Sequence, residues 1–164
     1  FAYTGGATAA LAKSGARVTH VDAAKNMVER AKTNCALSGV AGDRVRYIVD
    51  DCAKFVAREY KRGKRYDAVV MDPPSYGRGP GGEMWKLEDS IYGLVEQTAR
   101  ILTDKPLFFL INSYTTGLQP TVMADILGLC LPRGRIEGYE VTLPTQDARV
   151  RLPCGCSAIW TEDA

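Results

Sequence analysis

Short apolar runs alternate along the chain with stretches in which apolar residues have helical spacing, from the first residue to about Gly128. Strands separated by helices are typical of βαβ units and a parallel sheet, so the pattern predicts an α/β fold. The expected strands cover residues 1–3, 17–21, 45–49, 66–71 and 107–113, and the expected helices cover 7–14, 24–38, 52–62, 85–102 and 120–130.

The last part of the chain breaks this alternation. Segments 135–143 and 149–160 both have a strand-like composition, and no helical pattern separates them. Two strands joined by a short connection pair antiparallel. We therefore expect a C-terminal antiparallel hairpin at one edge of a mostly parallel sheet.

The chain starts with only three residues before a glycine turn and without Met. A strand usually has about five or six residues, so we expect the first strand to be incomplete. The sequence is then expected to be a fragment that lacks an N-terminal segment of a longer protein. Its length of 164 residues predicts one domain over 1–164.

Composition narrows the class of protein. The chain is 46% hydrophobic and 24% charged, which is typical of a soluble globular protein. It has no apolar stretch long enough to span a bilayer and no signal peptide, so a cytoplasmic protein without membrane contact is expected. Five cysteines with no CxxC pair indicate neither a disulfide framework nor a zinc site, and we expect no metal.

The first candidate site is a glycine turn followed by an acid. Gly5 and Gly6 follow the first strand, and Asp22 ends the second. In this layout a nucleoside lies across the strand ends, with the acid accepting hydrogen bonds from ribose hydroxyls. The dinucleotide pattern GxGxxG is absent, which weakens the case for a pyrophosphate. Acids also end the next two strands, at 50–51 and at Asp72, and this negative charge favours a cationic ligand.

The second candidate site is the stretch "DPPSYGRGP". Asp72 ends an apolar strand, and Pro73 and Pro74 have no amide hydrogens and a fixed φ. The backbone after the acid is therefore stiff, and its carbonyls are expected to be free for another partner. Glycines at 77, 79, 81 and 82 predict a flexible lid. Such an elbow at the carboxyl end of a buried strand is where open α/β sheets bind ligands.

The segments "FAYTGG", "VTHVD", "VDDCAKF" and "DPPSYGRGP", in that order, resemble the first four motifs of class I S-adenosylmethionine-dependent methyltransferases. The family related to the bacterial 23S ribosomal RNA methyltransferases is the most similar, and the resemblance covers nearly the whole chain. It implies a Rossmann-like fold, S-adenosylmethionine as the cofactor and an RNA substrate, in particular ribosomal RNA.

The resemblance also implies a cofactor site at the ends of the first three strands. Cys52 stands where the family usually has alanine, but its backbone amide serves equally well. The implied residues are Tyr3, Thr4, Gly5 and Gly6 at the methionine end, Asp22 and Ala23 at the ribose, and Asp51 with the Cys52 amide at the adenine.

For the target, the resemblance implies that Asp72 and the carbonyls near Pro73 and Pro74 accept hydrogen bonds, while Tyr76 stacks on an extruded base. Family members that methylate exocyclic amines often carry Asn where Asp72 stands, so the acid leaves the target atom open.

A subset of the family methylates C5 of pyrimidines and needs a cysteine thiolate. In the family that thiol follows the fifth strand, where Tyr114 stands here, and the elbow has Ser75 instead of cysteine. A base nitrogen is therefore favoured over C5 as the methylated atom.

Other interpretations remain open. Asp72 could simply terminate a strand, and Asp22 could cap the next helix. His20 lies inside a strand, which indicates a packing or hydrogen-bonding role. A nicotinamide-dependent oxidoreductase would also use a βαβ nucleotide site, and a non-catalytic RNA-binding module would keep the same fold. Arg78 and Lys86, which flank the lid, are candidates for phosphate contact.

Overall fold

The structure is a computed structural model that describes residues 1–78, 84–131 and 133–162. The chain forms two compact units, Phe1–Arg58 and Glu59–Ala164, and each has its own paired strands. Helix α3 (Cys52–Lys61) begins in the first unit and ends in the second. The expected lid glycines at 79, 81 and 82 lie outside the described residues.

The first unit contains a pair of parallel strands. They pair in register, with Val18 opposite Val45 and Asp22 opposite Val49, so both strands end at the same edge. The strand expected at 45–49 is confirmed. The elements of this unit before α3 are α1 (Gly6–Lys13), β1 (Val18–Asp22), α2 (Lys25–Leu37) and β2 (Val45–Val49).

Helix α2 has one buried face. Val28, Ala31 and Cys35 are each at most 2% exposed, and their spacing of three and four residues places them on one side of the helix. The helix ends at Leu37, and Gly39 has a φ of 73° in the left-handed region. Glycine adopts this conformation without a steric penalty, so it ends the helix as the sequence predicts.

Residues 1–3 do not form the strand end expected from the sequence. Tyr3 has a φ of 50°, which lies in the left-handed region and not in the β region. The backbone nitrogens of Phe1 and Tyr3 donate to the carboxylate of Asp22 at 3.0 and 2.9 Å. The carboxylate of Asp22 therefore binds this backbone, together with backbone bonds from Phe1 to Val21 and from Gly5 to Ala2.

The second unit contains a four-stranded sheet with the order β3-β6-β8-β7. β3 pairs parallel with β6, while β8 pairs antiparallel with both β6 and β7. The antiparallel pairing of the last two strands agrees with the sequence pattern. The elements are β3 (Ala68–Met71), β4 (Tyr76–Arg78), β5 (Met84–Lys86), α4 (Leu87–Ala99), β6 (Phe108–Ser113), α5 (Pro120–Cys130), β7 (Arg135–Pro144) and β8 (Arg151–Thr161).

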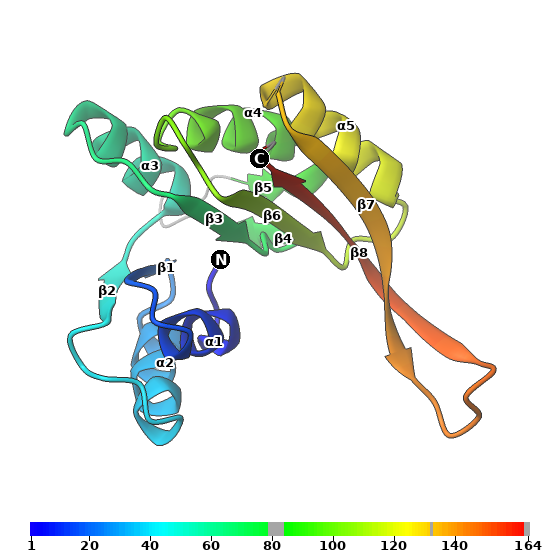
Figure 1. Cartoon of the computed structure of the whole chain (residues 1–164), viewed down its shortest axis with the longest axis horizontal. Coiled ribbons are helices and arrows are strands. Elements are labelled where there is room, and N and C mark those ends of the chain that lie inside the picture. The colour runs from blue at the N-terminus through cyan, green and yellow to red at the C-terminus, as the bar shows by residue number, and fades with distance from the viewer. Residues whose placement is uncertain (79–83, 132, 163–164) are drawn as a thin grey trace. The chain divides into compact units, whose positions relative to one another are not determined.

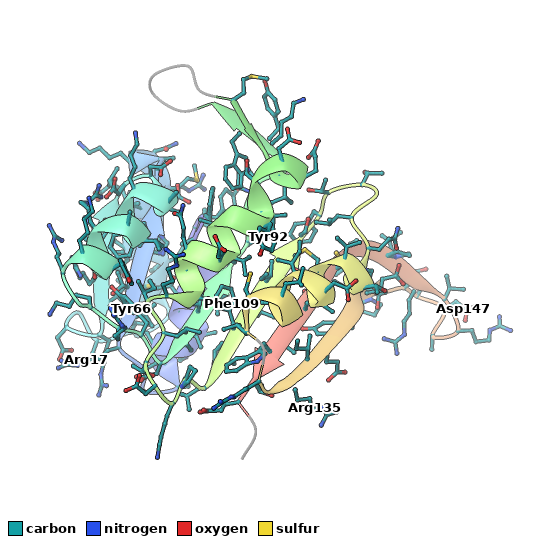
Figure 2. All side chains as sticks on the ribbon, turned by 90° about the horizontal axis from the view of Figure 1, so that it is seen from above. Arg17, Tyr66, Tyr92, Phe109, Arg135 and Asp147 are labelled. Atoms are coloured by element: carbon teal, nitrogen blue, oxygen red, sulfur yellow. The ribbon has the colours of Figure 1, made fainter. Side chains whose placement is uncertain are left out.

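Helices α4 and α5 lie on the same face of this sheet (Figure 1). On β6, every second residue is buried, namely Phe109, Ile111 and Ser113, as expected for a strand with one covered face. Phe109, labelled in Figure 2, is fully buried. The helices contribute further side chains with no exposed area, which are Leu87, Val95, Met123 and Leu127.

The sequence pattern does not predict the hairpin of β4 and β5. It predicts a helix from Trp85, but Trp85 pairs with Gly77 and Lys86 pairs with Tyr76 in an antiparallel ladder. The helix begins at Leu87. Strands of three residues are too short for their alternation to be distinguished from the first turn of a helix.

β7 and β8 continue beyond the sheet as a two-stranded arm, residues 141–155. Only the segment from Cys156 to Thr161 of β8 also pairs with β6. β7 and β8 pair over their whole lengths, with a register shift between Val141 and Thr142. Figure 2 places Arg135 at one end of this ribbon and Asp147 at its outer turn.

No helix among residues 1–78, 84–131 and 133–162 is long and apolar enough to cross a membrane. The same residues contain no cluster of three or more His, Cys, Asp or Glu that could hold a metal ion. The five cysteines are free thiols.

Two leucines of α5 test the assignment of the core. Leu127→Ala should lower the free energy of unfolding by about 2 to 5 kcal/mol, because Leu127 is completely buried and its removal leaves a cavity. Leu129→Ala is the matched control, since Leu129 is 72% exposed and its loss should change stability by less than about 0.5 kcal/mol. Urea denaturation of both variants measures the difference, and equal losses would contradict this packing.

Candidate active site

In the first unit, acidic residues stand where the two parallel strands end. Asp22 is the last residue of β1, and Asp51 follows β2. The backbone N–H of Asp50 donates to the carbonyl of Asp22 at 3.0 Å, which joins the two strand ends directly. The first two acids of the predicted series therefore share one edge of the β1–β2 pair. Asp72 belongs to the second unit.

The carboxylate of Asp22 is almost fully buried and accepts three hydrogen bonds. Oδ2 accepts from the backbone nitrogens of Phe1 and Tyr3, and Oδ1 accepts from the N–H of Ala24 at 2.9 Å. Burial alone would raise the pKa of Asp22, but the bonds from Ala24, Phe1 and Tyr3 and the charge of the Phe1 amino group outweigh it and lower the pKa. Asp22 is therefore a carboxylate at neutral pH that ties the glycine turn to α2.

Asp22 does not cap helix α2, so this alternative from the sequence is wrong. Helix α2 begins at Lys25 after Ala24, and no side chain caps its first turn. Asp22 bonds to the residue before the helix instead. A carboxylate offers about four acceptor positions, so about one remains beyond the three bonds to the backbone.

The two glycines of the turn have different requirements. Gly5 has a φ of 82°, and a Cβ there would lie 2.9 Å from the Cβ of Ala31. Gly6 begins α1, and a Cβ there would meet no atom within 4 Å. Asn34 holds the turn from α2 by donating to the carbonyl of Thr4 at 2.9 Å. Gly5 is thus fixed by packing, whereas Gly6 faces open space.

Asp51 and Cys52 form the start of α3. Oδ1 of Asp51 accepts from the N–H of Lys54 at 2.8 Å, which is the contact of a helix cap. Cys52 is the first helical residue, and backbone N–H groups of a first turn have no partner within the helix. Burial raises the pKa of the Cys52 thiol, so it is not an activated nucleophile.

His20 has the structural role that the sequence indicates. It is 1% exposed, and its Nδ1 is 2.9 Å from the hydroxyl of Thr8 on α1. Burial lowers the pKa of His20, which favours the neutral ring. Nε2 has no hydrogen-bond partner in the part of the chain that the structure describes.

In the second unit, Asp72 follows β3 and is exposed. The amide of Asn112 on β6 donates to Oδ1 of Asp72 at 3.1 Å. Partial desolvation raises the pKa of Asp72, and the bond from Asn112 acts against this. Asn112 was not among the candidates from sequence. Knowledge that β3 pairs with β6 would have identified Asn112. Met71 pairs with Ile111, so the next residues, Asp72 and Asn112, lie side by side.

The elbow after Asp72 is held by the β4–β5 hairpin. The indole N–H of Trp85 donates to the carbonyl of Pro74 at 2.7 Å, and the N–H of Leu87 donates to the carbonyl of Ser75 at 3.0 Å. The expectation that both proline carbonyls are free is therefore wrong for Pro74. The carbonyl of Pro73 has no hydrogen-bond partner among the residues that the structure describes.

Tyr76 lies beside the elbow on β4 and is 51% exposed. Its hydroxyl contacts the sulfur of Met84 at 2.8 Å. Tyr76 pairs with Lys86, and paired residues project to the same side of a hairpin. One side of the hairpin thus carries an exposed aromatic ring and a cation, while Trp85 projects to the other side.

The matching family model and the similar curated proteins are methyltransferases. A family model described as RNA cap guanine-N2 methyltransferase matches residues 1–109. The ribosomal RNA large subunit methyltransferase K/L of Allochromatium vinosum is 30% identical over 142 residues, which cover 81% of this chain and 19% of that protein.

Solved structures are also similar. The S-adenosylmethionine-dependent methyltransferase from Agrobacterium tumefaciens superposes with a TM-score of 0.90 at 31% identity, over 99% of this chain and 54% of that chain. A methyltransferase solved in complex with S-adenosylhomocysteine has a TM-score of 0.78 at 18% identity, over 98% of this chain and 43% of that chain. The expected Rossmann-like α/β fold is confirmed. The chain spans about a fifth of the curated relative and about half of the first solved structure.

The glycine turn offers a test that separates packing from ligand contact. Gly5→Ala should destabilise the protein by about 1 to 3 kcal/mol, because alanine is strained at this φ and would also clash with Ala31. Gly6→Ala should leave the melting temperature nearly unchanged, since its Cβ meets nothing. Thermal denaturation compares the two. A larger loss for Gly6→Ala than for Gly5→Ala would contradict the geometry of the turn.

Proposed function

The chain belongs to the RNA cap guanine-N2 methyltransferase family, and we propose that it transfers a methyl group from S-adenosylmethionine to a base nitrogen of ribosomal or other RNA. The match of the family model over residues 1–109 carries this proposal, because this range includes both the glycine turn and the Asp72 elbow. The similarity to a ribosomal RNA methyltransferase supports RNA as the substrate. We also propose that 1–164 acts as one methyltransferase domain.

The first unit would hold the cofactor. Asp22 has about one acceptor position left for a ribose hydroxyl, and Ala23 beside it is exposed. Gly6 leaves open space where a ligand can approach the backbone. The other proposed contacts are Tyr3, Thr4 and Gly5 at the methionine end and Asp51 with the Cys52 amide at the adenine. S-adenosylmethionine supplies a methyl group already activated on a positively charged sulfur, which suits this acidic edge.

The second unit would bind the target base. The catalytic task of its residues is alignment, because a nitrogen lone pair directed at the methyl group needs no covalent intermediate. Oδ2 of the exposed Asp72 is the acceptor available for an N–H of the base, and Tyr76 offers an exposed ring for stacking. The carbonyl of the buried Pro73 is the second proposed acceptor, since it has no hydrogen-bond partner among the described residues. Pro74 contributes stiffness, since its carbonyl is bonded to Trp85.

Lys86 would contact the RNA backbone. It is exposed and pairs with Tyr76 on the hairpin, so a base stacked on the ring would have its phosphate near a cation. Arg78 lies on the same hairpin and remains a candidate from the sequence alone.

Two of the three cysteines of the second unit, Cys130 and Cys156, support a nitrogen target over pyrimidine C5. C5 transfer needs a thiolate, and burial raises the pKa of both Cys130 and Cys156. Cys156 pairs with Ser113 and its sulfur contacts the carbonyl of Leu118 before α5, so it lies on the helix-covered face of the sheet. Neither thiol has the environment of a nucleophile.

Two other functions would use the same fold. A nicotinamide-dependent oxidoreductase is not favoured, since neither the family model nor the relatives belong to that class. A non-catalytic RNA-binding module would use the same hairpin without needing the acceptors at Asp72 and Pro73. Transfer of radiolabelled methyl groups to RNA by the full-length protein separates this module from the enzyme.

Cofactor binding is the first test. By isothermal titration the protein should bind S-adenosylhomocysteine and not NAD, and Asp22→Ala should weaken that binding about 10- to 100-fold through loss of a charged acceptor. Asp43→Ala is the matched control, because this exposed acid precedes β2 at the opposite end of the strand pair. Binding of NAD alone, or an unchanged dissociation constant for Asp22→Ala, would refute the assignment.

The methylated atom is the second test. Asp72→Ala should reduce the rate of methyl transfer about 10- to 100-fold or more. The affinity for S-adenosylhomocysteine should stay the same, because the lost acceptor contacts the target base and not the cofactor. Cys154→Ser and Cys156→Ser should keep their activity, and nucleoside analysis by mass spectrometry should find a base methylated on nitrogen. A folded but inactive serine variant with 5-methylcytidine or 5-methyluridine as the product would overturn the nitrogen target.

A further inference from the structure

Three polar side chains form a row across neighbouring strands of the second unit. Met71 of β3 pairs with Ile111 of β6, so the next residues, Asp72 and Asn112, come side by side. Asn112 in turn pairs with Ser157 of β8. Figure 1 shows these three strands adjacent in the sheet. The row therefore starts in the sheet and ends at the proposed catalytic acid.

Two hydrogen bonds join the row in one direction. The hydroxyl of Ser157 donates to Oδ1 of Asn112 at 2.7 Å, and the amide Nδ2 of Asn112 donates to Oδ1 of Asp72 at 3.1 Å. We propose that Asn112 and Ser157 are positioning residues that hold Asp72 as an ionised acceptor, with its Oδ2 directed to the base to be methylated. This inference rests on the proposed function of Asp72.

The polarity of the amide is the main argument. An asparagine has a donor end and an acceptor end, and an ionised carboxylate can only accept. The NH₂ group of Asn112 faces Asp72, and the amide oxygen at the other end accepts from the hydroxyl of Ser157. In the opposite orientation the amide oxygen would face Asp72, and that contact would require a protonated carboxyl. A hydroxyl can donate or accept, so the ionised Asp72 decides which end of the amide faces it, and the bond from the buried Ser157 holds the amide in that orientation.

Burial shows which end of the row is fixed. Ser157 is 4% exposed, and its neighbour Asn112 is half-buried, whereas Asp72 is exposed. A buried hydroxyl keeps its bond because no water replaces it. In the part of the chain that the structure describes, Oδ2 of Asp72 has no hydrogen-bond partner. One oxygen is thus held from the sheet and the other is available.

The row also affects the charge of Asp72. Within the second unit, desolvation raises the pKa of Asp72 and the bond from Asn112 lowers it. Removal of the donor therefore raises the pKa further. A protonated Asp72 is a poorer acceptor, so methyl transfer should fall as the pH drops through this pKa, and loss of the donor should move that fall to a higher pH.

The test uses Asn112→Asp, which keeps the size of the side chain and the bond from Ser157 but replaces the donor by a second carboxyl oxygen. The acid limb of the pH profile of kcat/KM should move up by about one unit or more, because two carboxylates at this distance cannot both ionise freely. S-adenosylhomocysteine affinity should stay within about twofold, since no cofactor contact is changed. Ser157→Ala should move the limb in the same direction by less.

Thr103→Val is the matched control. Thr103 donates to Asp67 at 3.2 Å, which is the same kind of bond to an acid just before β3, at its other end. This variant should leave the pH profile unchanged. If both Asn112→Asp and Ser157→Ala fold and keep the wild-type acid limb, or if Thr103→Val moves the limb equally, the positioning role is wrong.

A second readout separates this inference from the proposed function. The titration of the Asp72 carboxyl carbon, followed by NMR in the full chain, needs no enzymatic activity. Its midpoint should rise in Asn112→Asp and in Ser157→Ala, and unchanged midpoints overturn the positioning role. A wild-type protein that methylates no RNA would refute the proposed function, but the positioning role would still be judged on these midpoints.

Discussion

In both units, parallel pairing in register brings side by side the residues that come at or just after the last paired positions. β1 and β2 end at Asp22 and Val49, and the backbone bond from Asp50 to Asp22 closes the gap between them. β3 and β6 do the same for Asp72 and Asn112. The candidate site therefore depends on backbone pairing, because pairing in register brings together side chains that are distant in sequence.

At these strand ends the acids also organise the backbone. Three backbone nitrogens converge on Asp22, and charged hydrogen bonds of this kind are worth about 1.5 to 3 kcal/mol each. Asp51 caps α3, and Trp85 anchors the carbonyl of Pro74. The same side-chain and carbonyl groups that are candidates for ligand binding thus already stabilise the backbone. A ligand can use only those hydrogen-bond acceptor positions that the backbone leaves unoccupied.

The hydrophobic periodicity and the order of the motifs predicted several helices and strands and the class of enzyme. The strand at 45–49 and the helix at 120–130 have the bounds that their patterns predict, and the order of four motifs identified the methyltransferase class. These features depend on local spacing, which a sequence displays. The single domain over 1–164, the contacts to the cofactor and the methylated atom stay predictions.

The sequence could not give features that depend on partners distant along the chain. Residues 1–3 do not form a strand, and the nitrogens of Phe1 and Tyr3 bind the carboxylate of Asp22 instead. The carbonyl of Pro74 accepts from the indole of Trp85. Asn112 becomes part of the site only through its pairing with β3 and β8. In each case the deciding contact joins segments that no local window contains.

The position of β8 has a consequence for how the protein is made. β8 follows β7 in sequence but lies between β6 and β7 in the sheet. During synthesis at about 5 to 20 residues per second, β1 and β2 emerge early and can pair while the rest of the chain is still inside the ribosome. The edge of β6 that β8 later covers must wait for the segment from Cys156 to Thr161. The nascent second unit thus exposes an open edge until β8 has been synthesised, and this interval is when we expect it to need chaperones most.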